Sequence, residues 1–275
     1  MFAQINHAAI ISHQYPLLQK FYEAVFNMKG SSFRVTDAPI VADGYVGMQI
    51  IPRRDGYVGG LDHFGIVVDD VNVVLERMQK KHKKANIVKR PSTRPFAAYS
   101  GHDPDGNVFD LAQKKNDTRL DLYAQQANGS DTHERYINKF AIRTPNAEQC
   151  AEFYADVFEL QPVNRKTDAP GYHLTDGRIT LQIMPWSIPV FENMSIKRPG
   201  PDHLGFHVEN LDAFKKHVAE VAGMNPYLAP VPLGGSKESD VRKNFFAKHA
   251  TGKRQMSDPD GTVHQKAFAG QTFDR

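Results

Sequence analysis

The sequence has little cysteine: Cys150 is the single one among 275 residues, so no disulfide can form within the chain. It also lacks an apolar run that approaches the length of a membrane span. The chain enters the segment INHAAI at Ile5 without the basic region and apolar core of a secretory signal. We therefore expect a cytoplasmic protein that does not interact with a membrane.

An excess of one charge is also missing. The chain has 34 basic and 31 acidic residues and a formal net charge of +3. Such a balanced composition argues against nucleic acid as a partner, which usually selects a strongly basic surface. The length suits two ordinary domains, each large enough to bury its own core.

What the chain does contain is an internal duplication. The separation between matching segments grows from 132 residues for the first pair to 155 for the last, which indicates one duplication followed by insertions. The matching pairs are INHAAI (5–10) with INKFAI (137–142), FYEAVF (21–26) with FYADVF (153–158), DHFGIVV (62–68) with DHLGFHV (202–208), and DPDG (103–106) with DPDG (258–261).

Each half divides again into two similar modules, which start near Ile5, Leu61, Ile137 and Pro201. A module consists of an apolar strand with a polar residue, a helix and further strands. In the first module Pro16 suits the first helical turn, and Gly30 is expected to cap the helix at its carboxyl end.

In the second module the pattern predicts a helix from Val71 to Lys81. Strands are expected in the first module at SSFRV (31–35) and GYVGMQII (44–51). In the second they are expected at NIVKR (86–90), FAAYS (96–100) and NVFDLA (107–112), with DPDG as a turn before the last of these. We expect a first domain over residues 1–113, a polar linker over 114–136 and a second domain over 137–275.

Paired βαβββ modules, with histidine on an opening strand and a DPDG turn before the last strand, resemble the vicinal oxygen chelate superfamily. That superfamily includes glyoxalase I, the extradiol ring-cleaving dioxygenases and the bleomycin resistance proteins. The resemblance implies an α+β fold in which four βαβββ modules pair into two incomplete β-barrel domains. It also implies a metal held by residues from the first and last strands of each module.

Carried over by position, the resemblance assigns His7, Gln49, His63 and Asp110 to the metal in the first half. Two histidines and a carboxylate suit a divalent iron, manganese, nickel or zinc ion, with Gln49 as a fourth ligand, and the identity of the metal stays open. This concentration of good ligands favours pairing of adjacent modules.

The matching positions of the second half are Lys139, Gln182, His203 and Gln265. An ammonium group has no lone pair and repels a cation, so Lys139 cannot serve as a ligand while it is protonated. Gln265 also lacks the charge of a carboxylate. We expect this half to be degenerate as a metal site.

A metal-dependent reaction also needs a group that moves protons, and Tyr99 and His102, just before DPDG, are the candidates for catalysis. Tyr45 and Arg94 are further candidates. The alternative is that Tyr99 is an ordinary strand residue and His102 a turn residue. The spacing YSGHD is one residue longer than in extradiol dioxygenases, and a shift of one residue moves a side chain to the other face of a strand.

The leading hypothesis is a metal-dependent enzyme acting on a small-molecule substrate with vicinal oxygens, as a lyase, an isomerase or a ring-cleaving dioxygenase. The alternative is a metal-free small-molecule binding protein that resembles the bleomycin resistance proteins. Members of the superfamily often associate, so a homo-oligomer is compatible with either. The insertion at 229–254 is read as a lid, a subunit contact or a surface loop.

Overall fold

The computed structural model describes residues 1–30, 38–90, 97–117, 134–163, 171–185, 200–233, 240, 244, 246–247 and 254–268, the last six as backbone alone. Three expectations therefore lie wholly or mostly outside the described residues: the strand at 31–35, the linker at 114–136 and the insertion at 229–254. Arg94 lies outside them as well.

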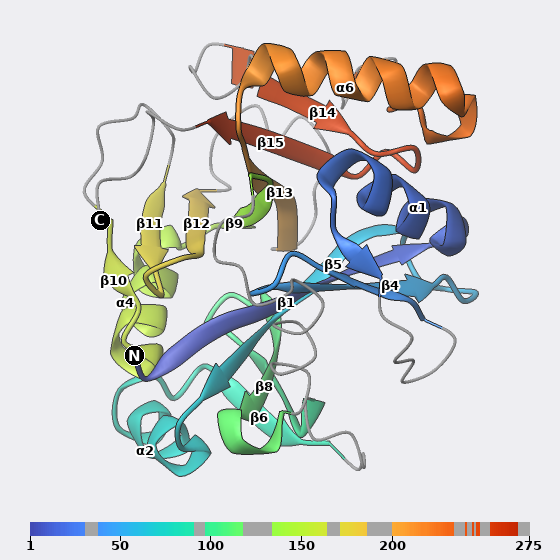
Figure 1. The fold of residues 1–275 in the computed structure, drawn as a ribbon. Helices are drawn as coiled ribbons and strands as arrows, with labels where there is room; N and C mark the ends of the chain where they lie inside the picture. The colour runs from blue at the N-terminus through green and yellow to red at the C-terminus, as the bar shows by residue number, and fades with distance from the viewer. Residues whose placement is uncertain are drawn as a thin grey trace.

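The described chain forms two mixed β-sheets, one from each half (Figure 1). The first has the strand order β2-β3-β4-β1-β5-β8-β7-β6 and the second the order β10-β11-β12-β9-β13-β15-β14. Both sheets are open at their edges, so the prediction of an α+β fold with incomplete barrels is confirmed. The strands of the first sheet are β1 (Ala3–Ser12), β2 (Lys29–Gly30), β3 (Ile40–Ala42), β4 (Gly47–Pro52), β5 (Gly60–Val68), β6 (Asn86–Lys89), β7 (Tyr99–His102) and β8 (Val108–Gln113).

The second sheet repeats this arrangement, and it contains β9 (Tyr136–Thr144), β10 (Gln161–Pro162), β11 (Tyr172–Thr175), β12 (Thr180–Pro185), β13 (Gly200–Val208), β14 (Gln255–Ser257) and β15 (Val263–Phe268). In both sheets the opening strands of consecutive modules pair antiparallel, β1 with β5 and β9 with β13. Adjacent modules therefore pair within each half, as the distribution of ligand residues predicts.

Within the described ranges, four α-helices have defined bounds: α1 (Tyr15–Phe26), α2 (Val71–Lys81), α4 (Ala147–Phe158) and α6 (Leu211–Met224). Helix α2 has the predicted bounds, and Asp70 caps it by accepting a hydrogen bond from the backbone nitrogen of Asn72. The expectation for Gly30 is wrong, because α1 ends at Phe26 with Asn27 in the left-handed conformation. Asparagine tolerates that conformation, so the chain turns three residues before the glycine.

The two DPDG segments form the turns that their residues predict. In the first, Asp103 Oδ1 accepts hydrogen bonds from the backbone nitrogens of Asp105 and Asn107, at 3.0 and 2.9 Å. In the second, Asp258 Oδ1 accepts from Asp260 and Thr262, both at 2.9 Å. The closing glycines have φ of 92° and 88°, which a residue with a Cβ rarely adopts.

The other oxygen of each of these aspartates contacts the opposite half of the molecule. The hydroxyl of Tyr22 on α1 donates to Asp258 Oδ2 at 2.8 Å, and the hydroxyl of Tyr154 on α4 donates to Asp103 Oδ2 at 3.2 Å. All four side chains are buried. The DPDG turn of each half is therefore also a point of attachment for a helix of the other half.

A second pair of hydrogen bonds follows the same exchange. Asp43 Oδ2 accepts from the backbone nitrogen of Ile137, and Asp176 Oδ2 accepts from that of Ile5, both at 2.7 Å. Helix α1 packs against α6, and α2 packs against α4, as Figure 1 shows at the right and at the lower left. The two halves are thus related by an approximate two-fold arrangement around a shared, hydrogen-bonded core.

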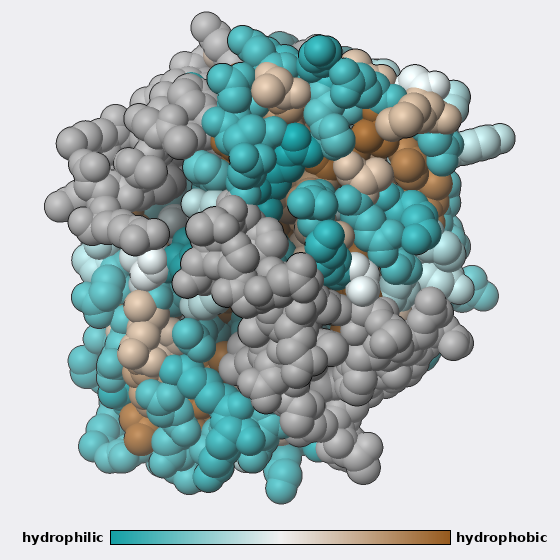
Figure 2. Space-filling view, in the orientation of Figure 1, coloured by the Kyte–Doolittle hydropathy of each residue, from teal (hydrophilic) through white to brown (hydrophobic). Residues whose placement is uncertain are grey.

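The longest described helix, α6, has 14 residues, and no helix in the described ranges is long and apolar enough to cross a membrane. On the face drawn in Figure 2, the described hydrophobic side chains lie in small groups separated by hydrophilic ones.

We predict that Tyr22→Phe and Tyr154→Phe each lower the free energy of unfolding by about 1–2 kcal/mol, because each removes one buried hydrogen bond and keeps the ring. The two bonds share no residue, so their effects should add in the double variant. Denaturant unfolding measures the loss, with Tyr227→Phe as control because Tyr227 is 79% exposed. A double variant as stable as the wild type would contradict the proposed attachment.

Candidate metal centre

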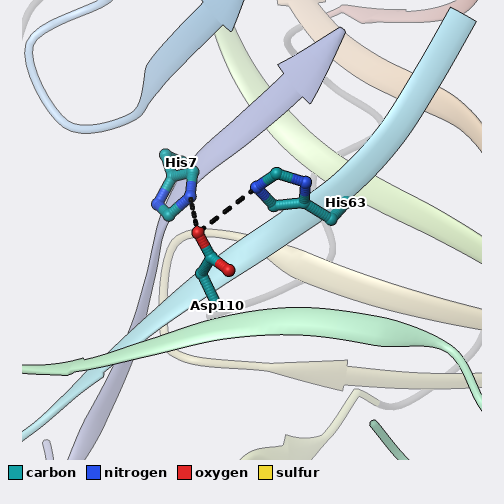
Figure 3. Close-up of side chains that lie close together, drawn as sticks. All are labelled: His7, His63 and Asp110. Atoms are coloured by element: carbon teal, nitrogen blue, oxygen red, sulfur yellow. Dashed lines mark ion pairs between the residues drawn. The ribbon is translucent and has the colours of Figure 1, made fainter. Parts of the chain in front are cut away.

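Three side chains from three neighbouring strands converge in the first half: His7 from β1, His63 from β5 and Asp110 from β8 (Figure 3). Asp110 Oδ2 lies 3.4 Å from His63 Nε2 and 3.8 Å from His7 Nε2. All three residues are buried, and their candidate ligand atoms lie within 4.8 Å of one another. The structure thus brings together three of the predicted ligands.

The strand register explains this convergence. His7 pairs with Gly65 across β1 and β5, and Gly65 pairs with Asp110 across β5 and β8, so the three positions form a row across the sheet. His63 is two residues from Gly65 and shares its face of β5. Gly65 has no side chain in the row, and a Cβ there would lie 1.8 Å from His7 Cε1. Glycine at position 65 therefore provides the space that the His7 ring occupies.

Hydrogen bonds hold both imidazoles in place. His63 Nδ1 lies 2.6 Å from Asp62 Oδ2, and His7 Nδ1 lies 2.9 Å from Asn6 Oδ1. Asn6 is held in turn, since its amide donates to Asp117 Oδ2 at 2.7 Å. With a proton on each Nδ1, the Nε2 atoms that face Asp110 are the ones left to bind a cation.

Arg90, just after β6, holds the carboxylate. Its Nη2 atom lies 2.7 Å from Asp110 Oδ1 and donates a hydrogen bond to Ser100 Oγ at 3.2 Å. Ser100 pairs with Asp110 across β7 and β8, so it lies beside the carboxylate on the same face. The two oxygens of Asp110 are therefore divided: Oδ1 faces the guanidinium and Oδ2 faces the histidines.

This arrangement favours a charged carboxylate. Burial acts to raise the pKa of Asp110, but hydrogen bonds and charges from His63 and His7 outweigh it and hold that pKa well below its usual range. Burial acts to lower the pKa of His63, whereas Asp110 and Asp62 raise it to about 9. The site without a metal is thus a place where positive charge is stabilised.

The donor set fits a divalent metal. Two ligands that are each about 2.1 Å from one ion lie roughly 3.0–3.4 Å apart in octahedral or tetrahedral geometry. The distances of 3.4 and 3.8 Å between Asp110 Oδ2 and the two histidines are near this range. Two imidazoles and one carboxylate are also the ligands that iron, manganese, nickel and zinc accept. His7, His63 and Asp110 could therefore hold such an ion after small movements.

A cleft of about 220 Å³ opens on this cluster. It reaches His63 and Asp110, and Gln49 on β4, the fourth predicted ligand, lines the same cleft. The full lining consists of Ile11, Gln49, Ile51, Pro52, Arg54, Tyr57, Asp62, His63, Arg90, Ala97 and Asp110.

Tyr99 and His102, the predicted catalytic residues, are not among these lining residues. Tyr99 pairs with Leu111, so its side chain lies on the face opposite Asp110, and it packs against the hydrophobic core. His102 directs its Nδ1 atom to the backbone oxygen of Asp103 at 2.9 Å. The structure does not bring either residue to the metal ligands. For Tyr99 this agrees with the one-residue difference in spacing, because such a shift moves a side chain to the other face of a strand.

The matching place in the second half has a different chemistry. Asp202 holds His203 Nδ1 at 2.6 Å, as Asp62 holds His63. Lys139 takes the place of His7, and its Nζ donates to Gln182 Oε1 at 3.3 Å. Burial lowers the pKa of Lys139 to about 8. Within the described part of the chain, the cluster able to hold a metal lies in the first half; the side chain of Gln265 lies outside that part.

Sequence reasoning missed Asp62, Gly65 and Arg90. A signal existed for the first two, because the pattern Asp-His-x-Gly occurs in both halves. In the second half, a Cβ at Gly205 would lie 2.6 Å from the Cβ of Lys139. Gly205 therefore leaves room for Lys139, as Gly65 leaves room for His7. No comparable repeat marks Arg90.

The comparisons show the fold: the chain has the fold of solved glyoxalase and dioxygenase structures. No protein-family model matches the sequence, and no curated protein does. Solved structures resemble it along almost its whole length. A mutant of 4-hydroxymandelate synthase from Streptomyces coelicolor is 12% identical, with 97% of this chain and 92% of that chain covered and a TM-score of 0.61.

The Mn(II)-bound glyoxalase from Novosphingobium aromaticivorans is 14% identical, with 97% of this chain and 82% of that chain covered and a TM-score of 0.57. A fusion of a xylose isomerase-like TIM barrel with 4-hydroxyphenylpyruvate dioxygenase is 12% identical, with a TM-score of 0.61. In that comparison 99% of this chain is covered, and the chain spans 50% of the fusion protein. At these identities the comparisons show the fold.

We predict that Lys139 makes stability depend on pH. Its pKa is 10.5 when exposed and about 8 in the folded protein, so between these values the unfolded chain binds more protons and stability rises with pH. The free energy of unfolding of the wild type, relative to Lys139→Met, should rise across that window by at most about 3 kcal/mol. Guanidinium unfolding between pH 7 and pH 10 measures this difference, and a flat difference would contradict the burial of the charge.

Proposed function

We propose that the protein is a metal-dependent enzyme that acts on a small substrate with vicinal oxygens. The observation that carries the proposal is the convergence of His7, His63 and Asp110, two of which, His63 and Asp110, line a cleft. A divalent metal bound there would act as a Lewis acid on two adjacent substrate oxygens. The two-histidine, one-carboxylate set leaves positions on such an ion for both oxygens.

The surrounding residues have separate tasks in this proposal. Asp62 and Asn6 keep the imidazoles turned so that Nε2 faces the ion. Arg90 forms an ion pair with Asp110 Oδ1, so Oδ2 is the oxygen that remains to bind the metal. Gln49 offers an amide oxygen as a further ligand, and Ile11 and Ile51 exclude water from one side of the cleft.

The reaction class follows from which substrate is accepted. A ring-cleaving dioxygenase would consume catechols and oxygen with iron or manganese, whereas an isomerase or lyase would act on compounds such as hemithioacetals with nickel, zinc or manganese. Activity of the protein loaded separately with each of these metals, measured on both substrate types, distinguishes the two. The glyoxalase and dioxygenases among the similar structures make both worth testing.

We predict about one divalent metal ion per chain after reconstitution, lost in His63→Ala and in Asp110→Ala because the two strong ligands that remain, even with a neutral amide oxygen added to them, rarely suffice to retain an ion through gel filtration. Elemental analysis of untagged protein measures the content. The matched control is His203→Ala, which removes the corresponding histidine of the second half and should keep the metal. Circular dichroism confirms that each variant is folded.

Full metal content in the folded His63→Ala variant would reject this ligand set. A wild type that binds none of the four metals would favour the other reading of the fold, a metal-free binding protein, which predicts ligand affinity that chelators leave unchanged.

We predict that Arg90→Gln weakens Mn(II) affinity by about 10–100-fold, the usual effect of removing a group that orients a metal ligand. The variant leaves Asp110 free to rotate and removes the charge that fixes Oδ1. Lys89→Gln is the control, because it removes the same charge from the neighbouring, exposed position. Isothermal titration measures both, and equal affinities in the two variants would show that Arg90 acts only through net charge.

A further inference from the structure

The carboxylates that line the cleft form ion pairs, whereas one of its two arginines does not pair with any described carboxylate. Its two carboxylates are both engaged, Asp110 with Arg90 and Asp62 with His63. Arg54 also lines the cleft, and none of the described carboxylates forms an ion pair with it. Two arginines and two carboxylates cancel, so a divalent metal at the centre would give the cleft an excess of two positive charges.

Arg54 is placed at the rim by a short loop between β4 and β5. The loop turns at Gly56, which has a φ of 83°, and the backbone nitrogen of Tyr57 donates to the oxygen of Arg54 at 3.1 Å. The neighbouring Arg53 points elsewhere, since its Nε donates to the backbone oxygen of Tyr57 at 2.8 Å and it does not line the cleft. The loop therefore contributes Arg54 to the lining of the cleft and uses the guanidinium of Arg53 to hold its own shape.

Apart from Gln49, His63 and the four charged residues, the wall is mainly apolar. Ile11, Ile51, Pro52 and Ala97 line it, and Tyr57 contributes an aromatic ring although 57% of its surface is exposed. The volume of about 220 Å³ is below the roughly 300–1,000 Å³ of sites for drug-sized ligands, so the cleft suits a single ring rather than a coenzyme.

We propose that the substrate is a small aromatic acid whose carboxylate is bound by Arg54 at the rim while its two vicinal oxygens face His7, His63 and Asp110. This inference rests on the proposed function for the position of the two oxygens. The carboxylate site itself depends on Arg54 and the apolar part of the wall, and a bound metal would add to its positive charge. A guanidinium binds a carboxylate with two parallel hydrogen bonds, which gives it direction as well as charge.

The test compares ligands that differ by one carboxylate. Catechol, 2,3-dihydroxybenzoate and 3,4-dihydroxybenzoate are titrated by calorimetry, without oxygen, into protein loaded with Mn(II). We expect at least one of the two acids to bind about tenfold more tightly than catechol, which corresponds to one accessible charge-assisted contact. Arg54→Gln should remove this preference and leave the affinity for catechol unchanged, whereas Arg54→Lys should keep part of it.

Lys89→Gln is again the control, because it removes one positive charge outside the cleft and should leave the preference intact. An equal affinity of the wild type for all three ligands would overturn the proposal, as would a preference that survives Arg54→Gln. Benzoate titrated into chelator-treated protein separates the two proposals, because it tests the carboxylate site without a metal. If the wild type fails to bind Mn(II) but its metal-free form binds benzoate through Arg54, the metal centre is rejected and the carboxylate site is kept.

Discussion

The antiparallel pairing of β1 with β5 is the constraint on which the site depends. It places His7 opposite Gly65, and the parallel pairing of β5 with β8 extends the row to Asp110. Because side chains alternate along a strand, a shift of one residue in either pairing would send a ligand to the core face. The buried apolar residues that fix this register, such as Phe64 and Phe109, are therefore also what fixes the geometry of the ligands.

The same scaffold carries opposite charge in its two halves. In the first half a buried carboxylate lies between two histidines and an arginine, and this environment stabilises a cation at the centre. In the second half Lys139 brings a cation of its own, next to Gln182 and within the influence of Asp202. The positions of His7 and Lys139 correspond in the two sheets, and each is surrounded by buried polar groups. The ammonium group of Lys139 supplies a positive charge to one set, and a bound metal ion would supply it to the other.

Much of this arrangement could be predicted from the sequence, because repeats and periodicity report on local structure. The four modules, the bounds of α2 and the DPDG turns were accessible in this way. The His7, His63 and Asp110 cluster was predicted from the resemblance to the vicinal oxygen chelate superfamily. The end of α1 could not be predicted from periodicity, because Asn27 can end a helix just as Gly30 can.

Contacts between segments distant in sequence were harder still to predict. Tyr99 was assigned to catalysis from its distance to DPDG, but strand face, which the pairing with Leu111 determines, directs it to the core. Arg90 and Arg54 have no repeated counterpart, and only the folded cleft shows that both line it.

The exchange of tyrosines between the halves has a consequence for the origin of the chain. Tyr22 reaches Asp258 and Tyr154 reaches Asp103, so each half offers one donor and one acceptor to the other. This is the reciprocal pattern of an isologous interface between two identical subunits. A single ancestral half could have made both bonds as a homodimer, and fusion of two gene copies would then have joined partners that already fitted one another.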